Sequence, residues 1–226
     1  MNNVIKGNLP TGGPLNFLNE AAQTNSRKNT VPVMALVAAH KPNSSEELKE
    51  LIKNHINQDC KCGLKSSGTV EDFSNNLYNA QFTNDSYKNK YPNEREFTFD
   101  ECYDFMYSLF CIGPLRALLT ENNSKKLLSN ILNKENIQHR IEDATEIEDF
   151  NYAIDYNIFV ILNSKEYKIG IQVKPQSFFK NKFAFNSNNN KHSKCNYPVC
   201  YHTYNNHTMK FIYYSTNDII DFIKNL

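Results

Sequence analysis

The chain has 226 residues, a formal net charge of +1 and 22% charged residues. This length predicts one or two domains, and the balanced charge excludes a strong overall attraction to nucleic acid or to membranes. The longest apolar run, Val31–Ala39, is far shorter than the ~20 residues that a membrane-spanning helix needs. Residues 1–30 lack the pattern of a signal peptide, so we expect a cytoplasmic protein whose six cysteines are reduced.

The N-terminal part of the sequence indicates an arm followed by short helices. Residues 1–30 are polar and contain a Pro-Thr-Gly-Gly-Pro turn, which predicts an irregular arm. Residues 32–39 are apolar and fit a buried helical turn or a strand. Ser44 and Glu47 have the spacing of a capping box, so a helix should start there.

A second group of helices is expected after a polar stretch. Residues 58–95 are rich in turn-forming residues and are predicted to form an irregular excursion. Order returns at Thr98 and Glu101, a second capping box. The apolar spacing of Phe105, Leu109 and Ile112 continues this helix up to Gly113, and further helices are predicted over 114–119 and 125–133.

The last third of the chain has the pattern of strands. Residues 154–162 are β-branched and aromatic, 163–166 form a turn, and 168–174 alternate before Pro175, which together predict a β-hairpin. A further strand is expected over 210–214, and a final helix capped at 215–217. We therefore predict an α/β (α+β) fold in a single domain spanning 1–226.

Three polar residues lie at the open end of this hairpin. Asp155 starts the first strand, and Gln172 and Lys174 are two apart on the second strand, so they project from the same face. Carboxylate and amide oxygens suit Mg²⁺, and a lysine can position water or stabilise phosphate charge. These groups fit phosphodiester hydrolysis, although the same string also occurs on ordinary solvated strands.

The run Ile154-Asp155 followed by Gly170-Ile-Gln-Val-Lys174-Pro175 resembles the catalytic motif of the PD-(D/E)xK nucleases. It is most similar to type II restriction endonucleases whose second strand reads Gln-Ile/Val-Lys-Pro. Ile154 and Gln172 stand where the family name has Pro and Asp/Glu. The run 15–23 is similar to the opening of MjaI-type restriction enzymes.

The resemblance implies a restriction-endonuclease-like core, in which a mixed sheet is flanked by helices. It implies Mg²⁺-dependent cleavage of double-stranded DNA by a homodimer on a palindromic site, in a bacterial or archaeal restriction-modification system. Asp155, Gln172 and Lys174 take the catalytic positions, with Asp155 and Gln172 as metal ligands. The family often adds a Glu from a preceding helix. Glu142 and Glu146 are candidates, with Glu142 preferred, and solvated surface acids are the alternative.

A basic segment follows the motif. Residues 167–217 contain seven Lys and no Asp or Glu, whereas 135–155 contain seven acids. Lys contacts phosphates and Asn can pair with adenine, but the 34 asparagines of the chain also fit a compositional bias. The DNA-binding candidates are Lys180, Lys182, Lys191, Lys194, Asn188 and Asn190, with Arg27 and Lys28 in the arm.

Cysteine and histidine residues leave a zinc site open as an alternative to reduced thiols. The candidates are Cys60 and Cys62, and the later set His192, Cys195, Cys200, His202 and His207, although neither spacing matches the usual paired ligands. No local signature supports a Cys–His nucleophile pair. Gly12-Gly13 lacks the Lys-Ser/Thr context of a phosphate loop, so no nucleotide cofactor is expected.

Two other functions fit the same sequence. One is another nuclease with this core, such as a repair or transposon-associated enzyme. The other is a DNA-binding or interaction protein without catalysis, in which the basic segment matters and Asp155 does not.

Overall fold

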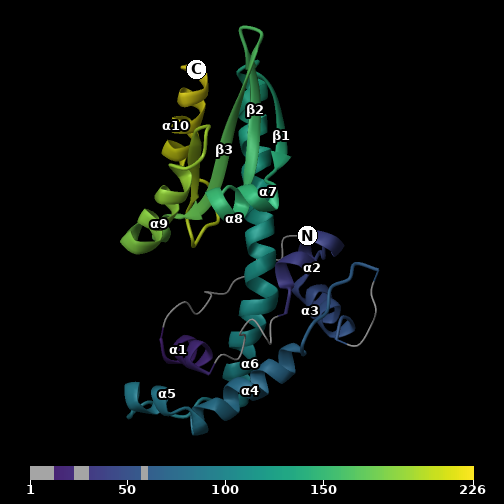
Figure 1. Cartoon of the computed structure of the whole chain (residues 1–226), viewed down its shortest axis with the longest axis vertical. Coiled ribbons are helices and arrows are strands. Elements are labelled where there is room, and N and C mark those ends of the chain that lie inside the picture. Colours follow the sequence, from purple (N-terminus) through teal and green to yellow (C-terminus); the bar gives the residue numbers. More distant parts are fainter. Residues whose placement is uncertain (1–12, 23–30, 57–60) are drawn as a thin grey trace. The chain divides into compact units, whose positions relative to one another are not determined.

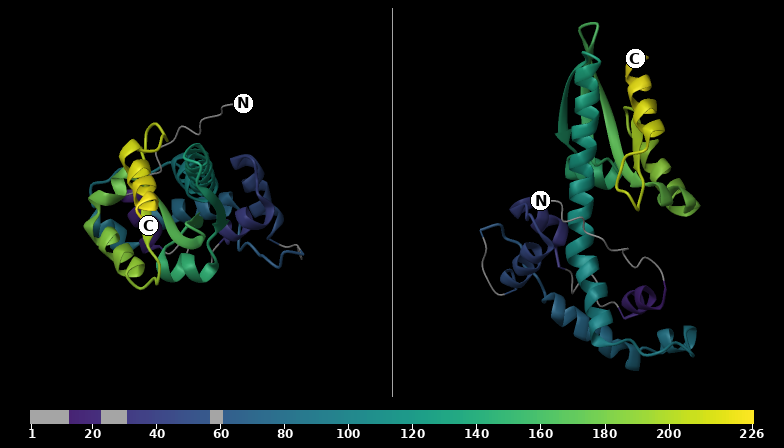
Figure 2. Two further views of the ribbon diagram at one scale, coloured as in Figure 1. Left: turned by 90° about the horizontal axis from the view of Figure 1, so that it is seen from above. Right: turned by 180° about the vertical axis from the view of Figure 1, so that it is seen from behind.

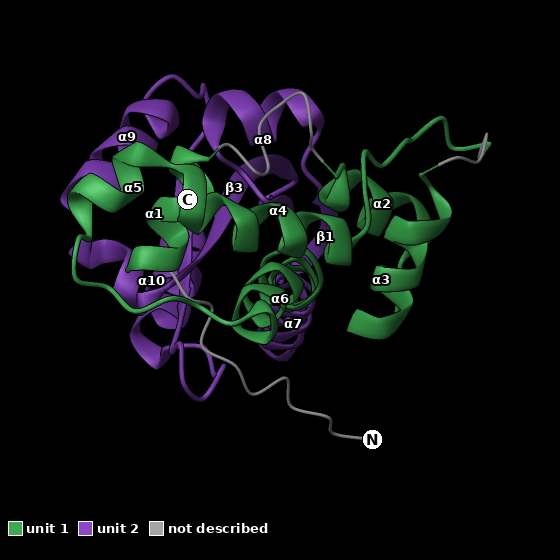
Figure 3. Cartoon of the chain, turned by 90° about the horizontal axis from the view of Figure 1, so that it is seen from below, with its two compact units in different colours: residues 1–118 green, residues 119–226 purple. Residues whose placement is uncertain are grey.

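The computed structural model describes residues 13–22, 31–56 and 61–226. The chain divides into two compact units, 1–118 and 119–226, which Figure 3 colours separately. This division differs from the single domain expected from the sequence, and the three motif residues all belong to the second unit. The described chain combines helices with one four-stranded mixed sheet, which confirms the predicted α+β class (Figure 1). The predicted contacts of Arg27, Lys28 and Cys60 lie outside the described residues.

The first unit is built from short helices around one core. The helices are α1 (Pro14–Ala21), α2 (Val33–His40), α3 (Ser45–Asn54), α4 (Val70–Thr83), α5 (Asp85–Lys90) and α6 (Phe99–Tyr107), followed by a π-helical turn over Ser108–Ile112. Their apolar faces bury Leu18, Leu36, Leu48, Leu77 and Met106 completely. The two predicted helix starts are confirmed, since Ser44 caps α3 and Thr98 caps α6.

Two expectations for this unit are corrected. The arm 1–30 contains α1, because Leu18 finds a buried place in the core. The excursion 58–95 contains α4 and α5 and is therefore not irregular as a whole. The start of α4 is a capping box formed by Thr69 and Asp72, a signal in which Asp takes the place of the usual Glu.

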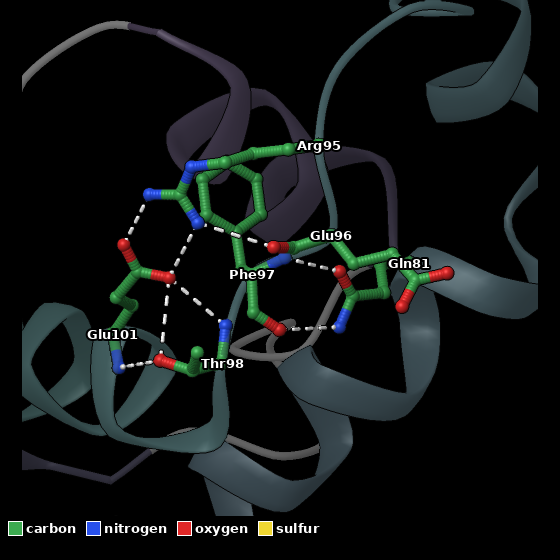
Figure 4. A network of polar contacts seen from close by, with 6 residues as sticks. All are labelled: Gln81, Arg95, Glu96, Phe97, Thr98 and Glu101. Carbon is green, nitrogen blue, oxygen red and sulfur yellow. Dashed lines mark hydrogen bonds and ion pairs between the residues drawn. The ribbon is translucent and has the colours of Figure 1, made fainter.

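A polar network fastens the start of α6 to α4 (Figure 4). The buried side chain of Gln81 bridges both backbone groups of Phe97: its amide nitrogen donates to the carbonyl at 3.0 Å, and its oxygen accepts from the N–H at 2.8 Å. Beside it, Arg95 forms an ion pair with Glu101 and holds the pKa of that carboxyl down at about 2. Gln81 thus satisfies both backbone groups of a residue that lies outside any helix or strand.

The second unit is organised around the sheet. After α7 (Gly113–Lys134) come β1 (Gln138–Asp143), α8 (Glu146–Tyr152), β2 (Tyr156–Leu162), β3 (Lys165–Pro175), a 3₁₀ turn (Gln176–Lys180), α9 (Lys182–His192), β4 (Val199–Tyr204) and α10 (Tyr213–Lys224). The strand order is β1-β2-β3-β4, with the first three antiparallel and β4 parallel to β3.

Helices cover both faces of this sheet. On one face, Leu128 and Leu132 of α7 and Ile219 and Ile223 of α10 pack against alternate strand residues such as Ile169. Figure 2 shows α7 along the back of the sheet. The other face carries polar strand residues that bond to α8 and α9. A sheet buried on both faces explains why 154–162 reads as a nearly continuous apolar run.

The sequence misplaces three elements of this unit. The helices expected over 114–119 and 125–133 are one continuous helix, α7, because Thr120 and Ser124 fit its buried side. The fourth strand is β4, over 199–204, and not 210–214, where Phe211 makes only an isolated bridge. Helix α10 accordingly starts at Tyr213, before the predicted cap at 215–217.

Candidate active site

The hairpin of β2 and β3 places Asp155 opposite Gln172, which confirms the predicted hairpin. Its turn consists of only two residues, Asn163 and Ser164, with φ of 51° and 64°. Two positive φ values are typical of the tight turn whose twist matches paired strands. The resulting register pairs Tyr156 with Ile171, so Asp155 stands one step further, beside Gln172.

Asp155 is held at the strand end by backbone bonds. Its N–H donates to the carbonyl of Ile171 at 2.9 Å, and its Oδ2 accepts the N–H of Val173 at 2.6 Å. The preceding residue, Ile154, is fully buried over Gly170, where an added Cβ would lie 2.9 Å from the Ile154 Cδ1. Ile154 therefore fixes the entry into the strand by packing.

Burial raises the pKa of Asp155 above its usual value, and the charge of Lys174 and the bond from Val173 counteract that rise. Lys174 follows two residues after Gln172, at the end of β3. Its ammonium lies 5.8 Å from the centre of the Phe178 ring. The carboxylate and the lysine of the predicted motif thus interact electrostatically at one end of the hairpin.

A second carboxyl group, Glu121 of α7, joins this pair. Burial raises its pKa to about 7, and the negative charge of Asp155 adds to the rise, whereas Lys125 and Lys174 oppose it. The charge of Asp155 thus disfavours ionisation of Glu121, so the two carboxyl groups interact electrostatically. Glu121 was missed in the sequence because 120–124 was interpreted as a break between two helices.

The two glutamates favoured from the sequence lie elsewhere. Glu142 is exposed on β1, where it accepts a bond from the Nε of Arg140 at 2.8 Å. Glu146 is exposed at the first turn of α8. The two residues therefore belong to different elements. Unlike Lys174, neither of them is among the main charges that shift the pKa of Asp155 or of Glu121.

Oxygen ligands from Asp155 and Glu121 fit a hard divalent cation such as Mg²⁺. The observation that supports this fit is the raised pKa of Glu121, because a cation beside Asp155 and Glu121 would remove the repulsion from Asp155 that disfavours the charged form of Glu121. Lys174 offsets that repulsion only in part.

Gln172 has a different environment from the one predicted. Its side chain is 2% exposed, and its Oε1 accepts from the Nδ2 of Asn188 at 3.0 Å and lies 3.1 Å from the Nε2 of His192. A carbonyl oxygen has two lone pairs, and these two contacts occupy them. Gln172 therefore anchors α9 to the sheet, next to Asp155 and Lys174. Burial, helped by the charge of Lys174, lowers the pKa of His192.

Some of the predicted DNA-binding residues are exposed, and others form hydrogen bonds within the protein. Four are exposed: Lys180, Lys182, Asn190 and Lys194. Lys191 donates to the carbonyl of Phe150 at 2.8 Å, which links α9 to α8. Asn188 is half-buried and donates to Gln172. Most of the Asn-rich stretch is helix α9.

A buried glutamate that the sequence analysis did not select lies on the same sheet face. Burial opposes ionisation of Glu148, but bonds from Lys168 and Tyr197 outweigh it and hold the pKa of Glu148 well below its usual range. The second oxygen of Glu148 accepts from Asn157 of β2 and from Thr145, its own capping partner. Glu148 therefore fastens α8 to the strands just before Asp155.

The later cysteine and histidine candidates do not gather. His202 is fully buried between Ser124 at 2.6 Å and Thr216 at 2.9 Å, and burial lowers its pKa to about 3. It therefore acts as a neutral link between α7, β4 and α10. Within the described ranges, the one group of three His, Cys, Asp or Glu side chains with metal-like spacing is His40, His55 and Cys62.

No helix in the described part of the chain has the length and apolarity to cross a membrane. Comparison of the chain with models of known protein families, with curated proteins and with solved structures finds no match.

Proposed function

We propose that the chain is a Mg²⁺-dependent phosphodiesterase that cleaves double-stranded DNA, as a type II restriction endonuclease does. The observation that carries the proposal is the electrostatic interaction of Asp155, Glu121 and Lys174: the charge of Asp155 raises the pKa of Glu121, and the charge of Lys174 lowers the pKa of both carboxyl groups. Perturbed ionisable groups gathered at one place are typical of active sites. The resemblance of the motif to the PD-(D/E)xK nucleases supports the same reaction.

Asp155 and Glu121 would hold the metal. When bound, Mg²⁺ supplies a polarised water for attack and stabilises charge on the phosphate. The bond from the Val173 N–H to Oδ2 fixes the carboxylate of Asp155, so its other oxygen is presented in one orientation. The ammonium of Lys174 can donate to a phosphate oxygen and oppose its charge. Gln172 keeps this strand end against α9.

The basic residues support DNA as the substrate. Lys180 and Lys182 are exposed and follow Lys174 by only six and eight positions, at the junction of the 3₁₀ turn and α9. Lysines near the reacting phosphate neutralise flanking phosphates of a duplex. Cleavage of both strands at a palindromic site requires two such centres, so we propose a homodimer.

The test is cleavage of a mixture of plasmids in Mg²⁺ by the wild-type chain and by Asp155→Ala. We expect discrete fragments from the wild type. Asp155→Ala should lose more than about 99% of the activity, since a ligand worth several kcal/mol of transition-state stabilisation disappears. Asp218→Ala, which removes an exposed carboxylate on α10, is the matched control and should cut normally.

Each other outcome counts against part of the proposal. Smeared products would indicate a nuclease without sequence specificity. Retarded but uncut DNA would indicate a binding protein. Cleavage by Asp155→Ala at more than about a tenth of the wild-type rate would contradict the assignment of the metal site.

A further inference from the structure

Three potential metal ligands converge in the first unit, whereas the residues assigned to catalysis belong to the second. His40 is the last residue of α2, His55 caps the end of α3, and Cys62 follows after a short connection. One ligand atom from each lies within 4.8 Å of the other two. All three side chains are buried or half-buried.

His55 is oriented as a metal-binding histidine is. Its side chain is 4% exposed, and its Nδ1 lies 2.6 Å from the carbonyl of Leu51, to which it donates. That bond places the proton on Nδ1 and leaves the lone pair on Nε2. The Nε2 faces the Sγ of Cys62 at 3.4 Å. A backbone carbonyl on the far nitrogen is the usual second contact of a metal-bound histidine.

His40 has a buried nitrogen that needs a partner. Its Nε2 is shielded from solvent and makes no hydrogen bond within the described residues. Its ring meets that of His55 edge to face, with centroids 4.9 Å apart. A buried polar atom without a partner destabilises the folded state, and a metal ion bound to this nitrogen would remove that cost.

We propose that His40, His55 and Cys62 bind a zinc ion. In tetrahedral zinc, with Zn–S near 2.3 Å and Zn–N near 2.0–2.1 Å, the sulfur and nitrogen ligands are about 3.5 Å apart. The Sγ–Nε2 distance of 3.4 Å between Cys62 and His55 matches this separation. Imidazole and thiolate are ligands that zinc prefers and Mg²⁺ does not. Binding displaces one proton, from the Cys62 thiol to solvent, and involves no change in oxidation state.

The position of the ligands assigns the zinc a structural role. It joins the ends of α2 and α3 to the segment that returns at Ser66, whose N–H donates to the His55 carbonyl at 2.9 Å. A ligand that binds only the folded state stabilises it, so zinc should raise the melting temperature of the chain. None of the three ligands belongs to the unit that contains Asp155.

The test uses the full chain, expressed with added zinc, gel-filtered and analysed for metal by mass spectrometry. We expect about one zinc per chain. Cys62→Ser and His40→Gln should each lose most of it. Cys195→Ser and His207→Gln are the matched controls, since they change a half-buried cysteine and an exposed histidine of the second unit, and both should keep the zinc.

A second measurement covers variants that fail to fold. The wild-type chain is stripped with a chelator and titrated with Co²⁺ alone, which should give a thiolate-to-cobalt absorption band and tetrahedral d–d bands. Absence of these bands, a wild-type zinc content below about a fifth of an equivalent after reconstitution, or full zinc retention by Cys62→Ser would each overturn the proposal. The DNA-cleavage test on Asp155 does not bear on these readouts.

Discussion

Glu121 gives the sharpest test of the proposed metal site, because its effect on stability and its effect on activity should have opposite signs. In the folded chain its pKa is about 7, against 4.5 for an unperturbed Glu. A difference of this size corresponds to up to about 3 kcal/mol that the folded state loses when Glu121 ionises.

The sign follows from proton linkage. Because the folded pKa lies above the unfolded one, the unfolded chain releases its proton first as the pH rises. The penalty is therefore small at pH 5, grows between 4.5 and about 7, and is complete at pH 8. Replacing Glu121 by Gln removes it, so the variant should gain up to about 3 kcal/mol in free energy of unfolding at pH 8, and less than about 1 kcal/mol at pH 5.

Urea unfolding of both chains in chelator at the two pH values measures this difference. Added Mg²⁺ should then stabilise the wild type at pH 8 more than the variant, and should restore no DNA cleavage to Glu121→Gln. Glu146→Gln, an exposed change on α8, is the control. It should change the free energy of unfolding by no more than about 0.5 kcal/mol and should leave DNA cleavage unchanged. The reasoning would be refuted by a stability gain that does not depend on pH, or by normal cleavage in Glu121→Gln.

Three further results are expected. Gln172→Glu should keep part of the activity and raise the pKa of His192, measured by NMR titration, because a carboxylate in that contact favours the charged imidazole; an unchanged pKa would contradict the contact. Replacing Lys180 and Lys182 together by Ala should flatten the salt dependence of DNA binding by up to about two units, and an unchanged slope would place the DNA surface elsewhere. Gln81→Ala should cost about 2 kcal/mol in urea unfolding, because two buried backbone groups lose their partner, whereas a cost below about 0.5 kcal/mol would show that water replaces it.

The hairpin was predictable because local signals agree. Residues 154–162 and 168–174 have strand composition, and the turn between them fixes which residues face each other, so the position of Asp155 opposite Gln172 follows from counting. The capped helix starts at Ser44 and Thr98 were predictable for the same reason, since a cap is a property of four consecutive residues.

The contribution of α7 was not predictable in this way. Most residues from 120 to 124 have low intrinsic helix propensity, and tertiary contacts, such as the bond between Ser124 and Tyr156, support the helix there. Glu121 reaches the site because of that continuity. The neighbours of Gln172 were not predictable either, because they come from helix α9, in an Asn-rich segment whose sequence suggests a loop. The same holds for the contact between His40 and His55, since these residues are fifteen positions apart and share no motif.

The tip of the hairpin has a consequence for how this chain can change during evolution. Asn163 and Ser164 are exposed, so residues that accept a positive φ, such as Gly, Asn and Asp, could replace them. The number of residues in the turn is constrained, because a single inserted residue would shift one strand against the other and turn Lys174 to the opposite face. Lineages of this protein should therefore tolerate substitutions at the tip, and should gain or lose residues there only in matched pairs, one from each strand.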